Sequence, residues 1–146
     1  MRGQAPLDFV RVVIELEVAS DVRHIERIVA MISRQVADLN FPAHVCSFNV
    51  PVALSEALSN AMLRGNGDDH AKRVRVRAAI DAVQLVLEVS DEGGGFDLEG
   101  YTSDPTTPEN IHREDGRGLY LMRRLMDRVE RFTDGGNVVR LTLRRP

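Results

Sequence analysis

Segments whose apolar residues recur with the period of a strand and segments with the period of a helix follow one another along this chain. Their order is the feature that most constrains its fold. Stretches rich in β-branched residues, in which apolar and polar side chains tend to alternate, predict strands. They lie at 9–18, 72–80, 83–90, about 129–133 and about 138–144. The last two flank Asp134-Gly135-Gly136-Asn137, a composition typical of a hairpin turn.

A helical period replaces the alternation in three places. From Ser20 or Asp21, which are favoured N-cap residues, apolar residues recur at helical spacing to about residue 39. A second helix is predicted from near Val50-Pro51 to Gly65-Asn66-Gly67, and a third over 117–128. The order of elements predicts an α/β (α+β) two-layer sandwich, with a mixed, mostly antiparallel sheet and helices packed on one face.

Length and composition fit one globular domain spanning 1–146. The 146 residues are 43% hydrophobic and 28% charged, and a chain of this length buries roughly two-thirds of its unfolded surface. No apolar stretch approaches the roughly 20 residues that span a bilayer. The start, Met1 to Pro6, lacks the apolar core of a signal peptide, and the single Cys46 cannot form an internal disulfide. We expect a cytoplasmic location and no membrane contact.

The charge argues against a nucleic-acid partner. The formal net charge is -3, whereas phosphate-backbone binding normally needs a basic face. Interleaved aromatic residues that could stack on bases are also missing. The row Arg73, Arg75 and Arg77 is interpreted as the solvated face of a strand, with an acidic partner as the alternative.

Residues 97–115 follow no period and are dominated by Gly, Pro, Thr and Asp. A loop of about 19 residues is uncommon in a compact domain and is usually either functional or disordered. We therefore predict a lid at about 97–115.

The first motif with chemical potential is Glu56-Ala57-Leu58-Ser59-Asn60, on the second predicted helix. Glu56 and Asn60 are four residues apart and so point the same way from a helix. An Asn carbonyl oxygen suits Mg²⁺, which keeps most of its waters and takes further ligands from phosphates. A carboxylate beside it could orient a hydroxyl or water. Taken alone, the pair suits the solvated face of an amphipathic helix better.

The second motif, Asp91-Glu92-Gly93-Gly94-Gly95-Phe96, follows a predicted buried strand. Glycine lets the backbone approach a flat ring closely, and a buried carboxylate can accept a hydrogen bond from an exocyclic amine such as that of adenine. Taken alone, the motif is better explained by an Asx-type turn with flexible glycines.

The third motif, Gly116-Arg117-Gly118-Leu119, is placed at the start of the third predicted helix. Free N–H groups and the helix dipole favour anions there, and Arg117 could add a charge-assisted contact to a phosphate. A plain glycine-containing helix start is the simpler interpretation of this motif in isolation.

The joint order of the three motifs is hard to obtain by chance. EALSNAMLRG resembles the N box of the GHKL ATPase superfamily, DEGGGF its first glycine box and GRGLYLMRRLMD its second. The short lid and the run LYLMRRLMD are similar to those of anti-sigma-factor serine/threonine kinases. The resemblance covers essentially the whole chain.

This resemblance implies a Bergerat-type ATP-binding fold, of the histidine-kinase-like ATPase kind, that uses ATP with Mg²⁺. By match of motif, Asn60 would be the Mg²⁺ ligand, Glu56 the catalytic base and Asp91 the adenine contact. The pocket would be shaped by Gly93, Gly95, Gly116 and Gly118, with Arg117 and Leu119 beside them. Arg64 stands where many relatives have His or Lys, which keeps a cation but changes its shape.

The leading hypothesis is a kinase that holds a sigma factor and phosphorylates a serine of a STAS-type anti-anti-sigma protein. The resemblance also implies a homodimer, for which the apolar-rich first strand could provide an interface. The alternative is a non-catalytic or differently targeted binding module, in which ATP only orders the lid to form a docking surface.

Overall fold

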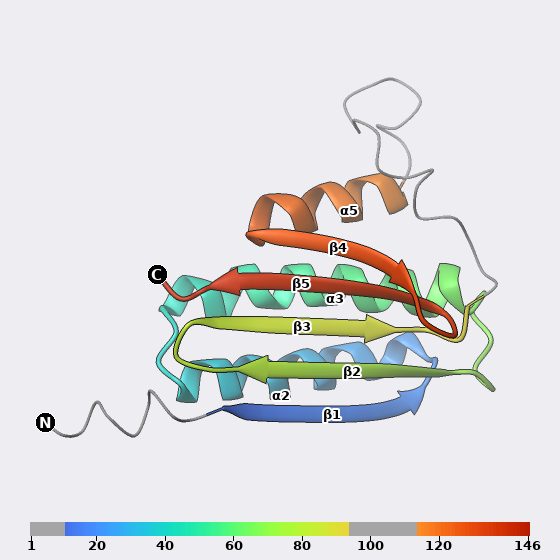
Figure 1. Ribbon diagram of the computed structural model, residues 1–146. Coiled ribbons are helices and arrows are strands. Elements are labelled where there is room, and N and C mark those ends of the chain that lie inside the picture. The colour runs from blue at the N-terminus through green and yellow to red at the C-terminus, as the bar shows by residue number, and fades with distance from the viewer. Residues whose placement is uncertain (1–10, 94–113) are drawn as a thin grey trace, which may run out of the picture.

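The computed structural model describes residues 11–93 and 114–146. The expected lid at 97–115 lies almost wholly outside these ranges, as does Gly95. In the part of the chain that is described, one sheet forms the front layer and helices pack behind it (Figure 1). No described helix combines the length and the apolar character needed to cross a membrane.

The sheet has five described strands in the order β1-β2-β3-β5-β4. They are β1 Val12–Ala19, β2 Arg73–Ile80, β3 Gln84–Ser90, β4 Arg128–Thr133 and β5 Asn137–Arg144. All four neighbouring pairs are antiparallel. The two-layer class is confirmed, but the expectation of a mixed sheet is wrong for the described strands.

The helices follow the predicted periods, with irregular turns at their ends. Asp21 caps the short helix η2 Val22–His24, its Oδ1 accepting the Arg23 N–H at 3.0 Å, and α2 Ile25–Asp38 continues from it. The second helix is longer than predicted at its start, because the π-helical turn η3 Val45–Asn49 precedes α3 Val50–Asn60. A second π-helical turn, η4 Ala61–Gly65, extends α3 to the predicted stop.

The third helix, α5, corrects the prediction at both ends. It spans Glu114–Leu125 rather than 117–128, because acidic residues suit a first helical turn even without an apolar period. Gly116 and Gly118 therefore lie within the helix and not just before it. Gly118 is its fifth residue, beyond the first four N–H groups that a helix leaves free.

The core lies between the sheet and the helices. Alternate residues of β2, β3 and β5, among them Val76, Leu87 and Leu141, are almost fully buried against it. The helices contribute residues at helical spacing, such as Ile32 from α2 and Leu58 from α3. Burial of apolar area on this scale is the main force holding the two layers together.

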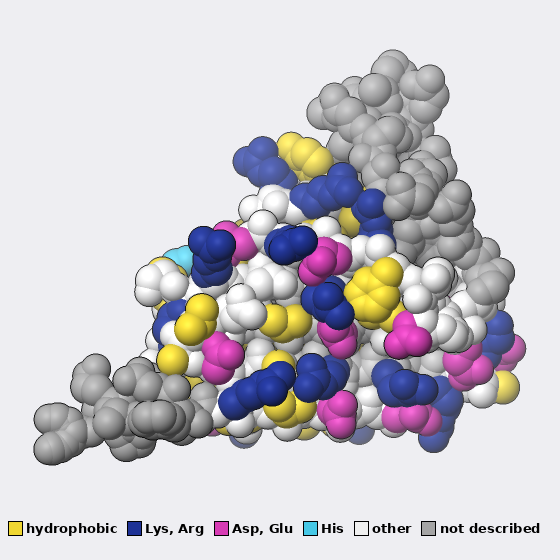
Figure 2. All heavy atoms as spheres, in the orientation of Figure 1, with side chains coloured by type: hydrophobic (Ala, Val, Ile, Leu, Met, Phe, Trp, Pro, Cys, Tyr) yellow, Lys and Arg dark blue, Asp and Glu magenta, His cyan; other side chains and the backbone are white. Residues whose placement is uncertain are grey.

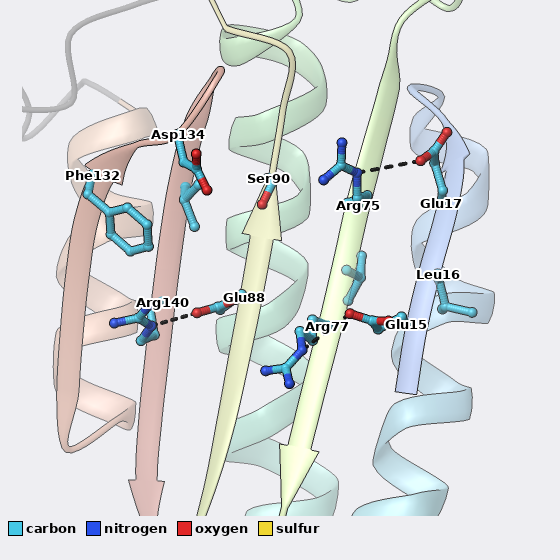
Figure 3. Close-up of a pocket in the computed structure, with 12 residues that line it drawn as sticks. Glu15, Leu16, Glu17, Arg75, Arg77, Glu88, Ser90, Phe132, Asp134 and Arg140 are labelled. Atoms are coloured by element: carbon cyan, nitrogen blue, oxygen red, sulfur yellow. Dashed lines mark hydrogen bonds and ion pairs between the residues drawn. The ribbon is translucent and has the colours of Figure 1, made fainter. Parts of the chain in front are cut away.

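The opposite face of the sheet is open and covered with paired charges (Figure 2). Arg75 Nε lies 3.5 Å from Glu17 Oε1 across the β1–β2 pair, and Arg77 Nε lies 3.3 Å from Glu15 Oε2. The Arg row is thus a solvated strand face, as predicted. A hollow of about 530 Å³ on this face contains these pairs (Figure 3).

Arg145, just after β5, links the sheet to the segment that follows α2. Its guanidinium donates to the carbonyl oxygens of Leu39, Asp81 and Ala82 at 2.7, 2.9 and 3.0 Å. It also stacks 4.1 Å from the ring centroid of Phe41. The segment that leads from α2 toward η3 is thereby fixed to the β2–β3 turn.

Candidate functional site

The helix α3 holds Glu56 and Asn60 at the boundary of the core. Its buried side is made by small and branched apolar residues, including Ala57 and Leu58. Glu56 and Asn60 are half-buried beside this apolar stripe. Helical geometry places residues four apart on one face, so both polar groups leave α3 in the same direction.

Gly118 of α5 lies directly against this pair. A Cβ on Gly118 would come within 2.6 Å of Glu56 Oε1 and 3.5 Å of Asn60 Nδ2. Since a real Cβ would need the Glu56 carboxylate to move, glycine permits the close approach of the two helices here. The N-box residues and the second glycine motif are thus neighbours in space.

Asp91 follows β3 and is held by the β4–β5 hairpin. Its Oδ1 accepts the N–H groups of Gly93 at 2.7 Å and Asn137 at 3.1 Å, while its own N–H donates to the Asn137 carbonyl at 3.0 Å. The Asn137 side-chain amide lies 3.5 Å from Oδ2. The carboxylate is therefore fixed in direction by main-chain groups from two segments.

Burial raises the pKa of the Asp91 carboxyl above its ordinary value, because only 8% of the residue is exposed. The hydrogen bonds from Asn137 and Gly93 oppose this shift, as does the charge of Lys72. A buried carboxylate that has accepting capacity left suits recognition of an amine.

A small pocket joins the two motifs. Asn60 and Asp91 both line it, together with apolar side chains and Asn137. The apolar lining residues are Ala57, Ala61, Val89 and Val139. The pocket measures only about 10 Å³, which is room for about one water molecule. Its lining of apolar side chains, a carboxylate and two amides is of the kind that recognises a nucleobase, and a base would need this pocket to widen.

Gly93, two residues after Asp91, has to be glycine for two reasons. Its φ of 81° lies in the left-handed region, which residues with a side chain rarely adopt. A Cβ there would also come within 2.7 Å of the Gly136 Cα in the hairpin. The first glycine motif thus packs against the β4–β5 turn.

The other predicted site residues that the structure describes do not line the pocket shared by Asn60 and Asp91. Arg64 is exposed on η4 and Arg117 is exposed on α5. Leu119 is 2% exposed and belongs to the core, which leaves its backbone as the part able to face a ligand. Gly116 lies in the first turn of α5, where a helix leaves its N–H groups free.

Three residues at the site were not predicted: Gly65, Asn66 and Asn137. Gly65 and Asn66 were interpreted only as a helix stop and Asn137 only as a hairpin residue. In the structure Gly65 touches the Asp91 carboxylate, and both asparagines bond to main-chain groups of the glycine segment or Asp91. Asparagine beside glycine at an element end was the available signal.

The residues present fit Mg²⁺ with ATP. Gly65 leaves room for the Asp91 carboxylate itself, because a Cβ on this glycine would overlap the carboxylate. Among the described residues no group of three or more His, Cys, Asp or Glu side chains could hold a metal. A magnesium ion on Asn60 would therefore draw its other ligands from water and phosphates, as this ion commonly does.

The chain belongs to the histidine kinase-like ATPase domain family. The model of that family matches residues 18–143, a span that includes α3, Asp91 and α5. The resemblance noted for the three motifs is thus confirmed over most of the chain.

Among curated proteins the chain is similar to serine-protein kinases named RsbW. It is 34% identical over 99 residues to that of Bacillus velezensis, covering 64% of this chain and 62% of the relative. The figures for RsbW of Bacillus subtilis are the same. An anti-sigma F factor of Clostridium beijerinckii is 27% identical over 99 residues, covering 66% of this chain and 68% of the relative. The match thus spans less than two-thirds of the RsbW relatives' length.

Among solved structures, the RsbU and RsbW domains of a Mycobacterium tuberculosis protein share the fold. The TM-score is 0.63 at 16% identity, and the match covers 92% of this chain and 33% of the other. At this identity the likeness bears on the fold alone, which it supports over nearly the whole chain.

Proposed function

We propose that this chain is an ATP-dependent serine/threonine protein kinase that acts as an anti-sigma factor. It binds a sigma factor and phosphorylates a serine of a STAS-type anti-anti-sigma protein, so that the sigma factor changes partner. Such a cycle belongs in the cytoplasm. The names of the relatives support the kinase and anti-sigma roles.

The observation that carries the proposal is the pocket shared by Asn60 and Asp91, with Glu56 beside it on α3. A nucleobase held at Asp91 and phosphates held near Asn60 would place reacting groups next to the Glu56 carboxylate. Phosphoryl transfer depends mainly on such positioning and on neutralisation of charge.

Each side chain has a separate task in this scheme. Asp91 accepts a hydrogen bond from the adenine amine, and Asn60 supplies an oxygen ligand to Mg²⁺. When bound, Mg·ATP supplies the transferable phosphoryl group and a cation that neutralises its charge. Glu56 orients the acceptor serine and takes its proton. Arg117, in the first half of α5, adds positive charge on the phosphate side.

Transfer of labelled phosphate from ATP to a candidate STAS protein tests the proposal. We expect labelling on serine that requires Mg²⁺ and the parental chain. Replacing Asn60 with Ala should abolish both the labelling and the magnesium-dependent part of ATP affinity. A chain that binds Mg·ATP and the partner but transfers no phosphate would instead be a nucleotide-gated binding module.

We also propose a homodimer. The strand β1 supports this, because it is paired only to β2 among the described strands and exposes 43% of Val13. Unpaired edges and exposed apolar side chains favour association. Light scattering at micromolar concentration should give twice the mass of the chain, and a stable monomer would contradict the proposal.

A further inference from the structure

The residue that ends η4, Gly65, forms one wall of the Asp91 site. A Cβ on Gly65 would overlap Cγ and Oδ2 of Asp91. Both residues are buried. The glycine is therefore required for space, and the extension of the N-box helix touches the carboxylate directly.

The next residue, Asn66, joins three segments through its side chain. Its Oδ1 accepts the N–H of Glu92 at 2.9 Å, and its Nδ2 donates to the carbonyl oxygen of Arg73 at 3.0 Å. The residue is 2% exposed, so water cannot readily replace either bond when the side chain is removed.

A closed ring of hydrogen bonds results. The N–H of Arg73, at the start of β2, donates in turn to Oε2 of the Glu92 side chain. Asn66, Arg73 and Glu92 thus each contact the other two. Such a ring resists movement of any one member, because the others keep their geometry.

This ring and the hairpin hold Asp91 from both sides. The N–H of Asp91 itself donates to the Asn137 carbonyl oxygen, and the N–H that follows, that of Glu92, donates to Asn66. With the peptide groups before and after its Cα fixed, Asp91 has little freedom in the direction of its side chain.

We infer that Asn66 is a positioning residue for nucleobase selection, which acts by fixing the Glu92 N–H and thereby aiming the Asp91 carboxylate at the exocyclic amine of adenine. The inference rests on the proposed binding of ATP. It assigns selectivity to a residue that contacts neither the base nor the phosphates.

The consequence is specific to one group of the ligand. If Asp91 is misaimed, ATP loses the hydrogen bond to its 6-amino group, whereas a purine triphosphate without that group has no such bond to lose. The ratio of the affinities for the two nucleotides therefore reports whether the Asp91 carboxylate is oriented toward the 6-amino group. A purely structural loss would lower both affinities together.

The test measures binding of ATP and of purine riboside triphosphate, which lacks the amine, by calorimetry with Mg²⁺. In Asn66→Ala we expect the ratio to fall about tenfold, near the lower end for a hydrogen bond to a charged group. In Asn66→Asp, which keeps an acceptor for Glu92 but loses the donor to Arg73, we expect a fall of about threefold.

Asn49 provides the matched control. Its Nδ2 donates to the Leu125 carbonyl oxygen at 2.9 Å, so Asn49→Ala also removes an asparagine bond to the main chain, but between η3 and α5. We expect its nucleotide ratio to stay at the parental value. Amide exchange by NMR should quicken at Glu92 in Asn66→Ala and stay unchanged there in Asn49→Ala.

The outcomes separate this inference from the proposed function. If the parental chain binds neither nucleotide, both the proposed function and this inference are wrong. A parental preference for ATP that survives in Asn66→Ala and Asn66→Asp, or that falls equally in Asn49→Ala, overturns the inference alone. If Asn66→Ala does not fold, the ratio in Asn66→Asp decides by the same criterion.

Discussion

The proposed adenine end and the proposed phosphate end of the candidate site are built differently. At the adenine end, Asp91 is 8% exposed and is held by main-chain N–H groups from two segments. At the phosphate end, Glu56 and Asn60 are half-buried and face a glycine on the neighbouring helix. In the first arrangement hydrogen bonds fix the direction of a carboxylate, and in the second a glycine lets two helices pack closely. In the proposed function, adenine would therefore meet a carboxylate of fixed direction, whereas the reacting groups would lie where two helices pack closely.

The largest effect should come from Glu56→Gln, which breaks the phosphate end alone. It keeps the shape of the side chain but removes the carboxylate, so phosphoryl transfer should fall roughly 10²- to 10⁴-fold, the usual contribution of a positioned general base. ATP affinity should persist, because Asn60 and Asp91 are unchanged. Single-turnover transfer with calorimetry on the same sample measures both. Transfer at the parental rate would show that Glu56 is not the base.

The next effect, from Asp91→Asn, breaks the adenine end alone. An amide keeps one accepting oxygen but replaces the other with an NH₂ group. That group would meet another donor, either the Asn137 side-chain amide, which lies 3.5 Å from the present Oδ2, or the adenine amine. We expect ATP affinity to fall roughly 10- to 100-fold, as for a lost hydrogen bond to a charged group. Calorimetry measures it, and unchanged affinity would remove Asp91 from the site.

Gly118→Ala tests whether the phosphate end can be disturbed without affecting the adenine end. The new Cβ needs the Glu56 carboxylate to move from 2.6 Å, which a flexible side chain can do at modest cost. We expect transfer to fall about tenfold or less, since small misplacements of catalytic groups slow reactions. The ratio of ATP to purine riboside triphosphate affinity should not change. If that ratio changes instead, the two ends are not independent.

The smallest effect should be a pH dependence confined to the adenine end. Burial raises the pKa of Asp91 in the folded chain, so its proton returns at a higher pH than that of an ordinary Asp carboxyl. Below that pKa the charged acceptor is lost, so ATP affinity should fall a few-fold as the pH is lowered through the folded pKa of Asp91. Asp91→Asn should lack this step when titrated by calorimetry.

The same shift has the opposite sign for stability. The folded state binds this proton more readily than the unfolded state, so charged Asp91 lowers the free energy of unfolding above its folded pKa. That penalty disappears as the pH falls through the folded pKa toward the unfolded value. Urea unfolding of the parent and of Asp91→Asn, compared over this range, isolates the contribution.

Most of the fold could be predicted because hydrophobic periods decide it. The alternation in 72–80 became β2 Arg73–Ile80 with its charged side in solvent, and the helical spacing after Asp21 became η2 and α2. Strand direction is not encoded in that way. Two helices between β1 and β2 would also suit a parallel crossover, so the antiparallel pairing had to come from the structure.

The site could be predicted from the sequence only for residues whose own side-chain chemistry suits a ligand. Glu56, Asn60 and Asp91 lie in short motifs whose chemistry is visible in the sequence. The Asn66 side chain accepts from the Glu92 N–H 26 residues away, and the Asn137 N–H donates to the Asp91 carboxylate 46 residues away. A contact at that separation leaves no local pattern. The start of α5 at Glu114 was missed because its first turn has no apolar period.

The place of β5 in the sheet has a consequence for how the chain folds. It lies between β3 and β4 although it follows both in sequence, so β4 has no neighbour among the described strands until β5 pairs. Its register with β3, which sets Val138 opposite Ser90, brings together distant parts of the chain, and such non-local pairing slows folding. The same step delivers Asn137 to Asp91. A chain in which β5 has not yet paired with β3 therefore lacks the Asn137 groups that hold Asp91, and in the proposed function nucleotide binding should appear only after that pairing.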